Sequence, residues 1–133
     1  MDHHRSVAIL EDEAFIALEL EDMLRDAGFD IAGVFSSCAD ALEWFRGSSP
    51  DIVVMDIGLA DGDCVRIATL LDGRNIPFVV HSANYANSGF HDPIFLQGTW
   101  VAKPASPSEL RNAIHASLAM ANGYDVSWSA EAG

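Results

Sequence analysis

The stretch DIVVMDIGLADGD, residues 51–63, carries the clearest fold signal of the chain. Its apolar run at 52–55 is short and has no polar alternation, which predicts a strand buried on both faces of a sheet. The run ends on a carboxylate, Asp56, and two glycines and two further aspartates follow. The stretch therefore predicts a core strand that opens directly into a polar loop.

Apolar runs and helical patterns alternate along the rest of the chain. Strands are expected at 7–10, 31–35, 52–55, 77–81 and 99–102, and helices at 13–27, 39–46, 63–71 and 107–122. This alternation predicts an α/β protein with a five-stranded parallel sheet covered on both faces. In such sheets the functional crevice lies at the carboxyl ends of the strands.

Three helix features are specific enough to check. In the first helix, Phe15, Leu18, Met23 and Leu24 are expected to face the core, with Gly28 ending the helix. Before the last helix, Ser106 and Glu109 form a capping box around a proline at the first helical position. Residues 83–98 stand where a fourth helix belongs, but their Gly, Pro, Asn and Ser residues predict a short or irregular element.

Length and composition limit the class of protein. The 133 residues indicate one domain at 1–124 with a C-terminal tail at 125–133 and no output domain. The net charge of −13 opposes direct DNA binding and binding to anionic membranes. No signal peptide or membrane span is recognisable, so we expect a cytoplasmic protein. Cys38 and Cys64 do not form a disulfide framework and are expected to be reduced and structural.

Reactive side chains follow the predicted strands. Glu11 and Asp12 follow the first strand, Asp56 the third and Ser82 the fourth, while Lys103, the only lysine of the chain, follows the fifth. Carboxylates crowded at one sheet edge repel one another, and a hard dication such as Mg²⁺ relieves that repulsion. A carboxylate beside Mg²⁺ can attack phosphorus and form an aspartyl phosphate. Lys103 and the Ser82 hydroxyl are then the candidates to bind the phosphoryl oxygens.

These motifs together resemble the receiver domain of two-component response regulators, over about residues 5–122. The resemblance implies a flavodoxin-like (βα)5 three-layer sandwich that binds Mg²⁺. It implies that Asp12 ligates the metal directly and that Glu11 does so through water. Asp56 corresponds to the phosphorylated residue, and Gly58 to the position whose backbone carbonyl reaches the metal.

The same resemblance assigns the remaining site residues. Ser82 corresponds to the switch hydroxyl, Lys103 to the phosphate-pairing lysine and Trp100 to the switch aromatic residue. The Lys103–Pro104 bond is often cis in this family. Phosphohistidine on a sensor histidine kinase or a histidine phosphotransfer protein would be the donor, and an unknown downstream protein the target, with homodimerisation left open. The resemblance implies no enzyme activity beyond self-dephosphorylation.

Several positions depart from the family pattern. Gly58 replaces a more usual side chain, Ala105 follows Lys103-Pro104, and His81 precedes Ser82. His81 either tunes phosphate lifetime or, as we favour, is a hydrogen-bonded strand-end histidine. The segment PFVVHSANY, residues 77–85, resembles the "PF-A-T-G-Y" variant of some stand-alone receivers, in which the fourth helix is poorly formed. Because no output domain is expected, we expect a single-domain regulator.

Three alternatives stay open at this point. A pseudo-receiver would use the same fold as a phosphorylation-independent interaction module. A phosphatase of the haloacid dehalogenase type would need a second aspartate at the position of Gly58. A flavodoxin-like flavin protein would need a phosphate-binding loop where Glu11 and Asp12 would repel phosphate. Purely structural interpretations also remain: Trp100 as a core residue, and Asp61 and Asp63 as surface or helix-start acids.

Overall fold

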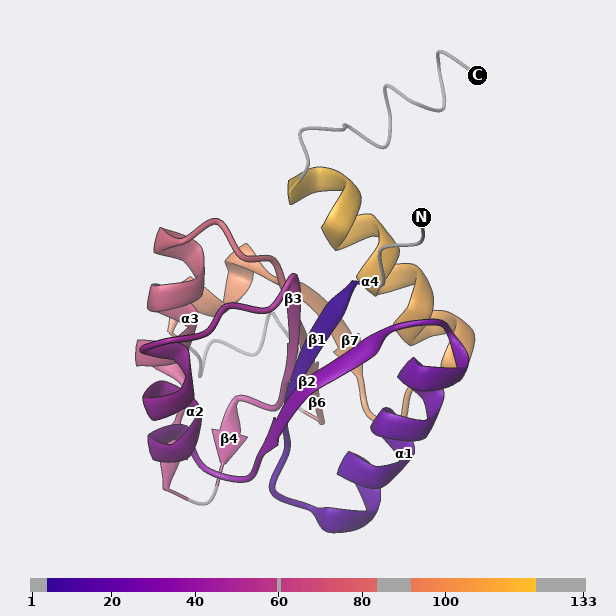
Figure 1. Ribbon diagram of the computed structural model, residues 1–133, viewed down its shortest axis with the longest axis horizontal. Coiled ribbons are helices and arrows are strands. Elements are labelled where there is room, and N and C mark those ends of the chain that lie inside the picture. Colours follow the sequence, from indigo (N-terminus) through magenta and orange to yellow (C-terminus); the bar gives the residue numbers. More distant parts are fainter. Residues whose placement is uncertain (1–4, 60, 84–91, 122–133) are drawn as a thin grey trace.

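The fold is a parallel sheet with two helices on each face, as Figure 1 shows for the computed structural model. The structure describes residues 5–59, 61–83 and 92–121. Its five-stranded sheet has the order β2-β1-β3-β6-β7, and its paired neighbours are all parallel. The strands are β1 (Ser6–Leu10), β2 (Asp30–Phe35), β3 (Ile52–Met55), β6 (Phe78–Ser82) and β7 (Thr99–Ala102). This strand order is that of flavodoxin-like folds, so the predicted fold class is confirmed.

The helices form the outer two layers. On one face lie α1 (Ala14–Asp26) and α4 (Pro107–Ala121), and on the other lie α2 (Cys38–Phe45) and α3 (Val65–Gly73) (Figure 1). Every residue of β3 is buried, and its side chains alternate between the two helical layers. Val53 and Met55 join the α2–α3 core, whereas Ile52 and Val54 join the α1–α4 core. The apolar run therefore serves both cores, as predicted from its lack of polar alternation.

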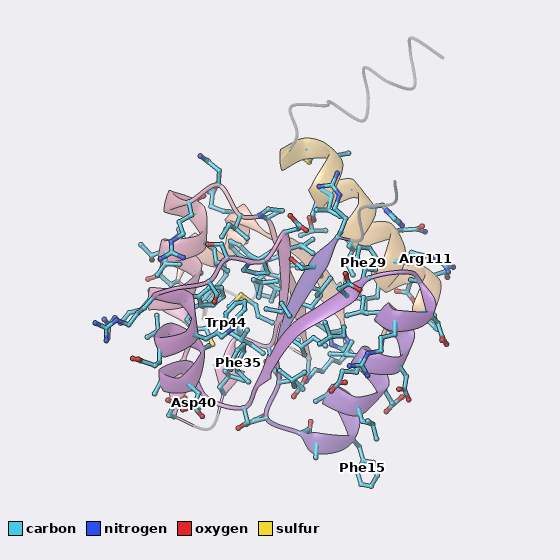
Figure 2. The ribbon with its side chains drawn as sticks, viewed as in Figure 1. Phe15, Phe29, Phe35, Asp40, Trp44 and Arg111 are labelled. Atoms are coloured by element: carbon cyan, nitrogen blue, oxygen red, sulfur yellow. The ribbon has the colours of Figure 1, made fainter. Side chains whose placement is uncertain are left out.

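The predicted inward face of the first helix is wrong at Phe15 and Leu18, whereas Leu24 is buried as predicted and Met23 packs against the α1–α4 core. Phe15 and Leu18 are 84% and 56% exposed, and Phe15 points away from the body of the protein (Figure 2). The buried residues of α1 are Ala17, Leu20 and Leu24. Phe15 and Leu18 each lie two residues from a member of that stripe, a spacing that places side chains on different faces of a helix.

The predicted helix boundaries are mostly confirmed. Glu109 N–H donates to Ser106 Oγ at 3.2 Å, and Ser106 N–H donates to Glu109 Oε1 at 3.3 Å, which completes the capping box. Gly28 follows the end of α1 with φ of +94°, a conformation that favours glycine.

The loop after β3 differs from the prediction. Residues 58–63 include a short antiparallel hairpin, β4 (Gly58–Leu59) and β5 (Gly62–Asp63), so α3 begins at Val65 instead of Asp63. Between β6 and β7, the described residues form the 3-10 helix η1 (Pro93–Gln97), as expected for a short element. Residues 84–91 of that segment, and the predicted tail at 125–133, lie outside the described residues. Within the described ranges, no helix has the length and apolar character needed to span a membrane.

Candidate functional site

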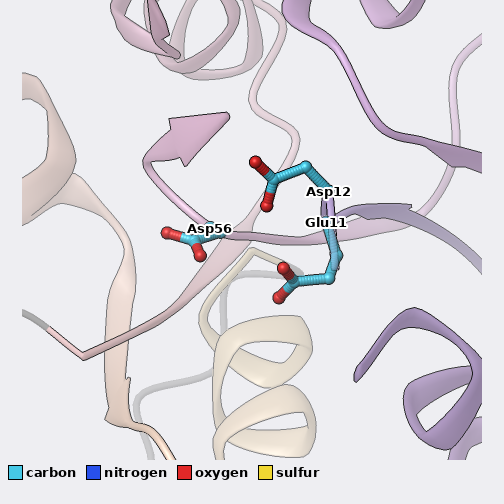
Figure 3. Close-up of side chains that lie close together, drawn as sticks. All are labelled: Glu11, Asp12 and Asp56. Atoms are coloured by element: carbon cyan, nitrogen blue, oxygen red, sulfur yellow. The ribbon is translucent and has the colours of Figure 1, made fainter. Parts of the chain in front are cut away.

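Three carboxylates meet at the carboxyl edge of the sheet. Glu11 and Asp12 follow β1, and Asp56 follows the adjacent strand β3. The Asp56 backbone N–H donates to the Leu10 carbonyl at 2.9 Å, which holds the two strand ends side by side. Carboxylate oxygens of the three residues all lie within 4.8 Å of one another (Figure 3). The structure thus brings together the acidic residues that the sequence placed at separate strand ends.

Lys103 brings a positive charge into this cluster from the end of β7. Its Nζ lies 2.7 Å from Asp56 Oδ2 and 2.8 Å from Glu11 Oε1. The exposed fractions of the side chains are 13% for Lys103, 16% for Asp56 and 1% for Glu11. The Lys103–Pro104 peptide bond is cis, as expected. Shielding from water makes these contacts stronger than an exposed ion pair would be.

Burial and pairing shift two protonation equilibria here. Burial raises the pKa of Glu11, and this outweighs the lowering by Lys103. Burial alone would lower the pKa of Lys103, but hydrogen bonds to Asp56 and Glu11 outweigh burial and raise it. Lys103 is therefore firmly cationic at neutral pH.

The donor set fits a hard dication. When all three carboxylates are ionised, the one ammonium group leaves two negative charges within a few ångströms. All three acidic side chains offer oxygen, the ligand atom that Mg²⁺ prefers, and Asp12 is exposed on the solvent side. A divalent ion would neutralise the remaining charge.

Ser82 and Gly58 flank the carboxylates. Ser82 is buried at the end of β6, and its carbonyl accepts a hydrogen bond from Lys103 N–H at 3.0 Å. Gly58 N–H donates to Asp56 Oδ1 at 3.2 Å. A Cβ atom at Gly58 would meet nothing within 4 Å, so the space beside Asp56 is open. Both residues lie where the sequence placed them, next to the strand that carries Asp56.

Trp100 lies in β7, three residues before Lys103, and is half-buried. Its Nε1–H donates to the Phe95 carbonyl at 2.9 Å, which links β7 to η1. The side chain also packs against the α2–α3 core. Trp100 thus connects the strand that leads to Lys103 with the segment before that strand.

His81 departs from the hydrogen-bonded histidine that the sequence suggested. It is buried, and among the described residues neither ring nitrogen has a hydrogen-bond partner. Burial lowers its pKa, and the charge of Lys103 lowers it further. The ring lines a pocket of about 270 Å³ between α1 and α4, together with Leu20, Lys103 and Leu110.

Asp61 has a role that the sequence did not reveal. Its Oδ1 accepts from Cys38 N–H at 2.7 Å and its Oδ2 from Ala39 N–H at 3.0 Å. These two hydrogen bonds lower the pKa of Asp61 and cap the start of α2. The capped helix lies more than twenty residues earlier in the chain, so no local spacing signal could have identified this contact.

Comparison with known proteins identifies relatives of this chain. A family model described as the response regulator receiver domain matches residues 7–115. The transcriptional regulatory protein PdtaR of Mycobacterium tuberculosis is 36% identical over 80 residues, which cover 59% of this chain but only 39% of PdtaR. The chemotaxis protein CheY of Thermotoga maritima is 28% identical over 115 residues, covering 84% of this chain and 95% of CheY.

A solved structure agrees with these sequence relatives. The solution NMR structure of the REC domain of the response regulator PhyR from Erythrobacter litoralis matches with a TM-score of 0.72 and 28% identity. The match covers 92% of this chain and 93% of that domain. The fold, the acidic edge with its lysine and these relatives lead to one conclusion: the chain belongs to the receiver domain family of two-component response regulators.

Proposed function

We propose that this receiver domain is a phosphorylation switch whose phosphoacceptor is Asp56. Receiver domains interact with histidine kinases or phosphotransfer proteins, and a phosphohistidine on such a partner is the proposed donor. An Asp56 carboxylate oxygen attacks phosphorus, the phosphorus–nitrogen bond breaks, and the imidazole of the donor leaves. The observation that carries this proposal is the position of Asp56, held between Lys103 and the acidic pair of β1.

Mg²⁺ is the proposed cofactor, held by Asp12, Asp56 and the Gly58 carbonyl, with Glu11 acting through water. When bound, the ion would neutralise the charge that accumulates between the carboxylates and the incoming phosphoryl group. The carboxylate oxygens of Asp12, Asp56 and Glu11 lie within 4.8 Å of one another, which supports a shared ion at this position.

Lys103 and Ser82 are the proposed phosphoryl-binding side chains. Lys103 Nζ now donates to Asp56 Oδ2, so phosphorylation of Asp56 would present a phosphoryl oxygen to the same ammonium group. Ser82 lies on β6, the strand next to β3, and its hydroxyl is the candidate donor to a second phosphoryl oxygen. A shift of Ser82 would be transmitted to β7, because Ser82 pairs with Ala102 and its carbonyl binds Lys103 N–H.

The proposed output is a change of protein contacts. A phosphoryl group adds negative charge and strong acceptor oxygens at the sheet edge, which biases an element that has two arrangements. Trp100 is the proposed reporter of this change, because its hydrogen bond to Phe95 ties β7 to η1. Receiver domains are generally non-enzymatic signalling modules, and self-dephosphorylation is the single reaction we propose beyond phosphoryl acceptance.

The test is phosphorylation of the purified protein by a small phosphoryl donor in the presence of Mg²⁺. Intact-mass measurement should show one added phosphoryl group in the native protein and none in Asp56→Asn. Asp72→Asn changes an exposed carboxylate at the end of α3 and is the matched control, which should be phosphorylated normally. Beryllofluoride with Mg²⁺ should change tryptophan fluorescence in the native protein and not in Trp100→Phe. Equal phosphorylation of Asp56→Asn would refute the assignment of the acceptor.

A pseudo-receiver is the second candidate, and one observation favours it. Lys103 already pairs with both Glu11 and Asp56, so two of the three carboxylates have a partner without any metal. Titration with Mg²⁺ separates the two functions. A folded protein that binds no Mg²⁺ at millimolar concentration would favour the pseudo-receiver.

A further inference from the structure

The fold brings the two cysteines of the chain into contact. Cys38 begins α2 and Cys64 precedes α3, and their Sγ atoms lie 3.1 Å apart although 26 residues separate them. Both side chains are buried. Nothing in their sequence spacing indicated a pair, and the distance requires only a small approach of the sulfur atoms to form a disulfide.

The two thiols are accessible to a small oxidant, and they differ in their exposure to solvent. A hollow of about 310 Å³ is lined by both cysteines, Asp61 and Arg66, which gives a small oxidant a route to the sulfur atoms. Cys38 is the more accessible of the two, at 9% exposed against 1% for Cys64. Cys38 is therefore the attacking thiol and Cys64 the resolving one.

The two cysteines also form hydrogen bonds with the segment that follows Asp56. Cys64 Sγ donates to the Asp56 carbonyl at 3.5 Å, and Cys64 N–H donates to the Ile57 carbonyl at 3.1 Å. Cys38 Sγ donates to the Gly62 carbonyl at 3.7 Å. Residues 56–62, which include Gly58, are thus bounded at both ends by hydrogen bonds from the two thiols.

We propose that Cys38 and Cys64 form a redox modification site that controls the acceptor segment. Hydrogen peroxide is the oxidant: Cys38 sulfur attacks one peroxide oxygen, the O–O bond breaks, and Cys38 sulfenic acid and water result. Cys64 sulfur then attacks Cys38 sulfur, the S–O bond breaks, and the thiol proton of Cys64 leaves with the hydroxide as a second water. Two thiols and one peroxide give one disulfide and two waters.

The disulfide has a defined consequence for the neighbouring site. Oxidation removes the S–H donors that hold the Asp56 and Gly62 carbonyls, and it joins the start of α2 to the start of α3. We expect weaker Mg²⁺ binding in the oxidised protein, by about two- to twelvefold, the loss that one neutral hydrogen bond accounts for. This consequence rests on the proposed function, whereas formation of the disulfide does not.

The experiment compares the full chain before and after treatment with hydrogen peroxide, and again after reduction with a phosphine. Intact mass should fall by two hydrogen atoms with the protein still monomeric, and peptide mapping should join the peptides of Cys38 and Cys64. Amide hydrogen exchange over residues 57–64 should change on oxidation and return on reduction. Mg²⁺ titration of the two forms should show the weaker affinity in the oxidised one.

Cys38→Ser is the control, because a hydroxyl keeps a donor at the helix start and cannot form the disulfide. Peroxide should leave its Mg²⁺ affinity and its exchange pattern unchanged, and Cys64→Ala serves if Cys38→Ser does not fold. Intermolecular crosslinks or sulfinic acid in place of the intramolecular disulfide would overturn the proposal. So would a disulfide that leaves exchange over residues 57–64 unchanged, or Mg²⁺ affinity that stays equal or rises. If neither form binds Mg²⁺, the proposed function fails, and mass and exchange still decide the redox site.

Discussion

Replacing Lys103 by methionine tests the electrostatic account of the site. The substitution keeps most of the side-chain volume and removes the ammonium group that lies 2.7 Å from Asp56 and 2.8 Å from Glu11. Removing one partner of a buried ion pair costs about 3–5 kcal/mol. Asp56 is partly exposed and can recover some hydration, so we expect a loss of about 2–4 kcal/mol in the free energy of unfolding without metal.

The loss should depend on pH in a defined direction. Burial already raises the pKa of Glu11 in the folded protein, and Lys103 opposes that rise. Without Lys103 the pKa of Glu11 should rise further, so the folded state will favour the protonated carboxyl. A group with a raised folded pKa contributes stability below its unfolded pKa and loses that contribution as pH rises through the folded value. The cost of Lys103→Met should therefore be largest at neutral pH and should shrink as pH falls toward 4.5, the ordinary pKa of Glu11.

Urea unfolding followed by far-ultraviolet circular dichroism, without divalent metal, measures this cost. Arg46→Met is the matched control, because Arg46 pairs with Glu43 at 3.3 Å on the exposed surface of α2. Exposed pairs contribute little, so the control should lose about 0.5 kcal/mol or less. Adding Glu11→Gln to Lys103→Met should restore part of the lost stability at neutral pH, since it removes the unpaired buried charge. If Lys103→Met lowers the free energy of unfolding no more than Arg46→Met does, the buried charge cluster does not stabilise the carboxyl edge of the sheet.

Three further substitutions and one control substitution test other parts of the structure. His81→Leu removes a buried imidazole whose pKa is lowered, so protonation of His81 opposes folding as pH falls below 6.5. Urea unfolding should therefore show that the substitution raises the free energy of unfolding more at pH 5.5 than at pH 7.5. Equal effects at the two pH values would contradict this. Gly98→Ala places a Cβ about 2.5 Å from the Phe78 ring and 2.7 Å from its carbonyl, and should cost about 1–3 kcal/mol by the same assay. Gly58→Ala is the control for Gly98→Ala, because a Cβ at Gly58 meets nothing within 4 Å. It should change the free energy of unfolding by no more than about 0.5–1 kcal/mol. Equal losses of stability in the two variants would argue against the close contact at Gly98. Phe15→Ser should leave the thermal midpoint nearly unchanged because Phe15 is exposed, and a loss of several degrees would mean that Phe15 packs on the protein.

Local patterns in the sequence were enough to predict the fold class. The buried strand at 52–55, the capping box at Ser106 and the glycine stop at Gly28 each depend on residues within a few positions of one another. The carboxyl-edge position of Asp56 and Lys103 also followed from the alternation of strands and helices, because parallel strands end at the same edge. The inward face of α1 was predicted correctly at Leu24 but wrongly at Phe15, which is apolar but lies outside the stripe that contacts the sheet.

Other features depend on contacts between distant parts of the chain. The sequence placed Glu11, Asp56 and Lys103 at strand ends, but the strand order and the backbone path decide that one ammonium group contacts two carboxylates. The cap that Asp61 provides for α2 and the contact of Cys38 with Cys64 likewise join residues more than twenty positions apart. The sequence by itself determined which elements form and which side chains stand at their ends, because propensity, periodicity and capping act over one or two turns of chain. Only the tertiary structure decided which of those side chains meet and which are shielded from water, because pairing and burial depend on how the elements pack together.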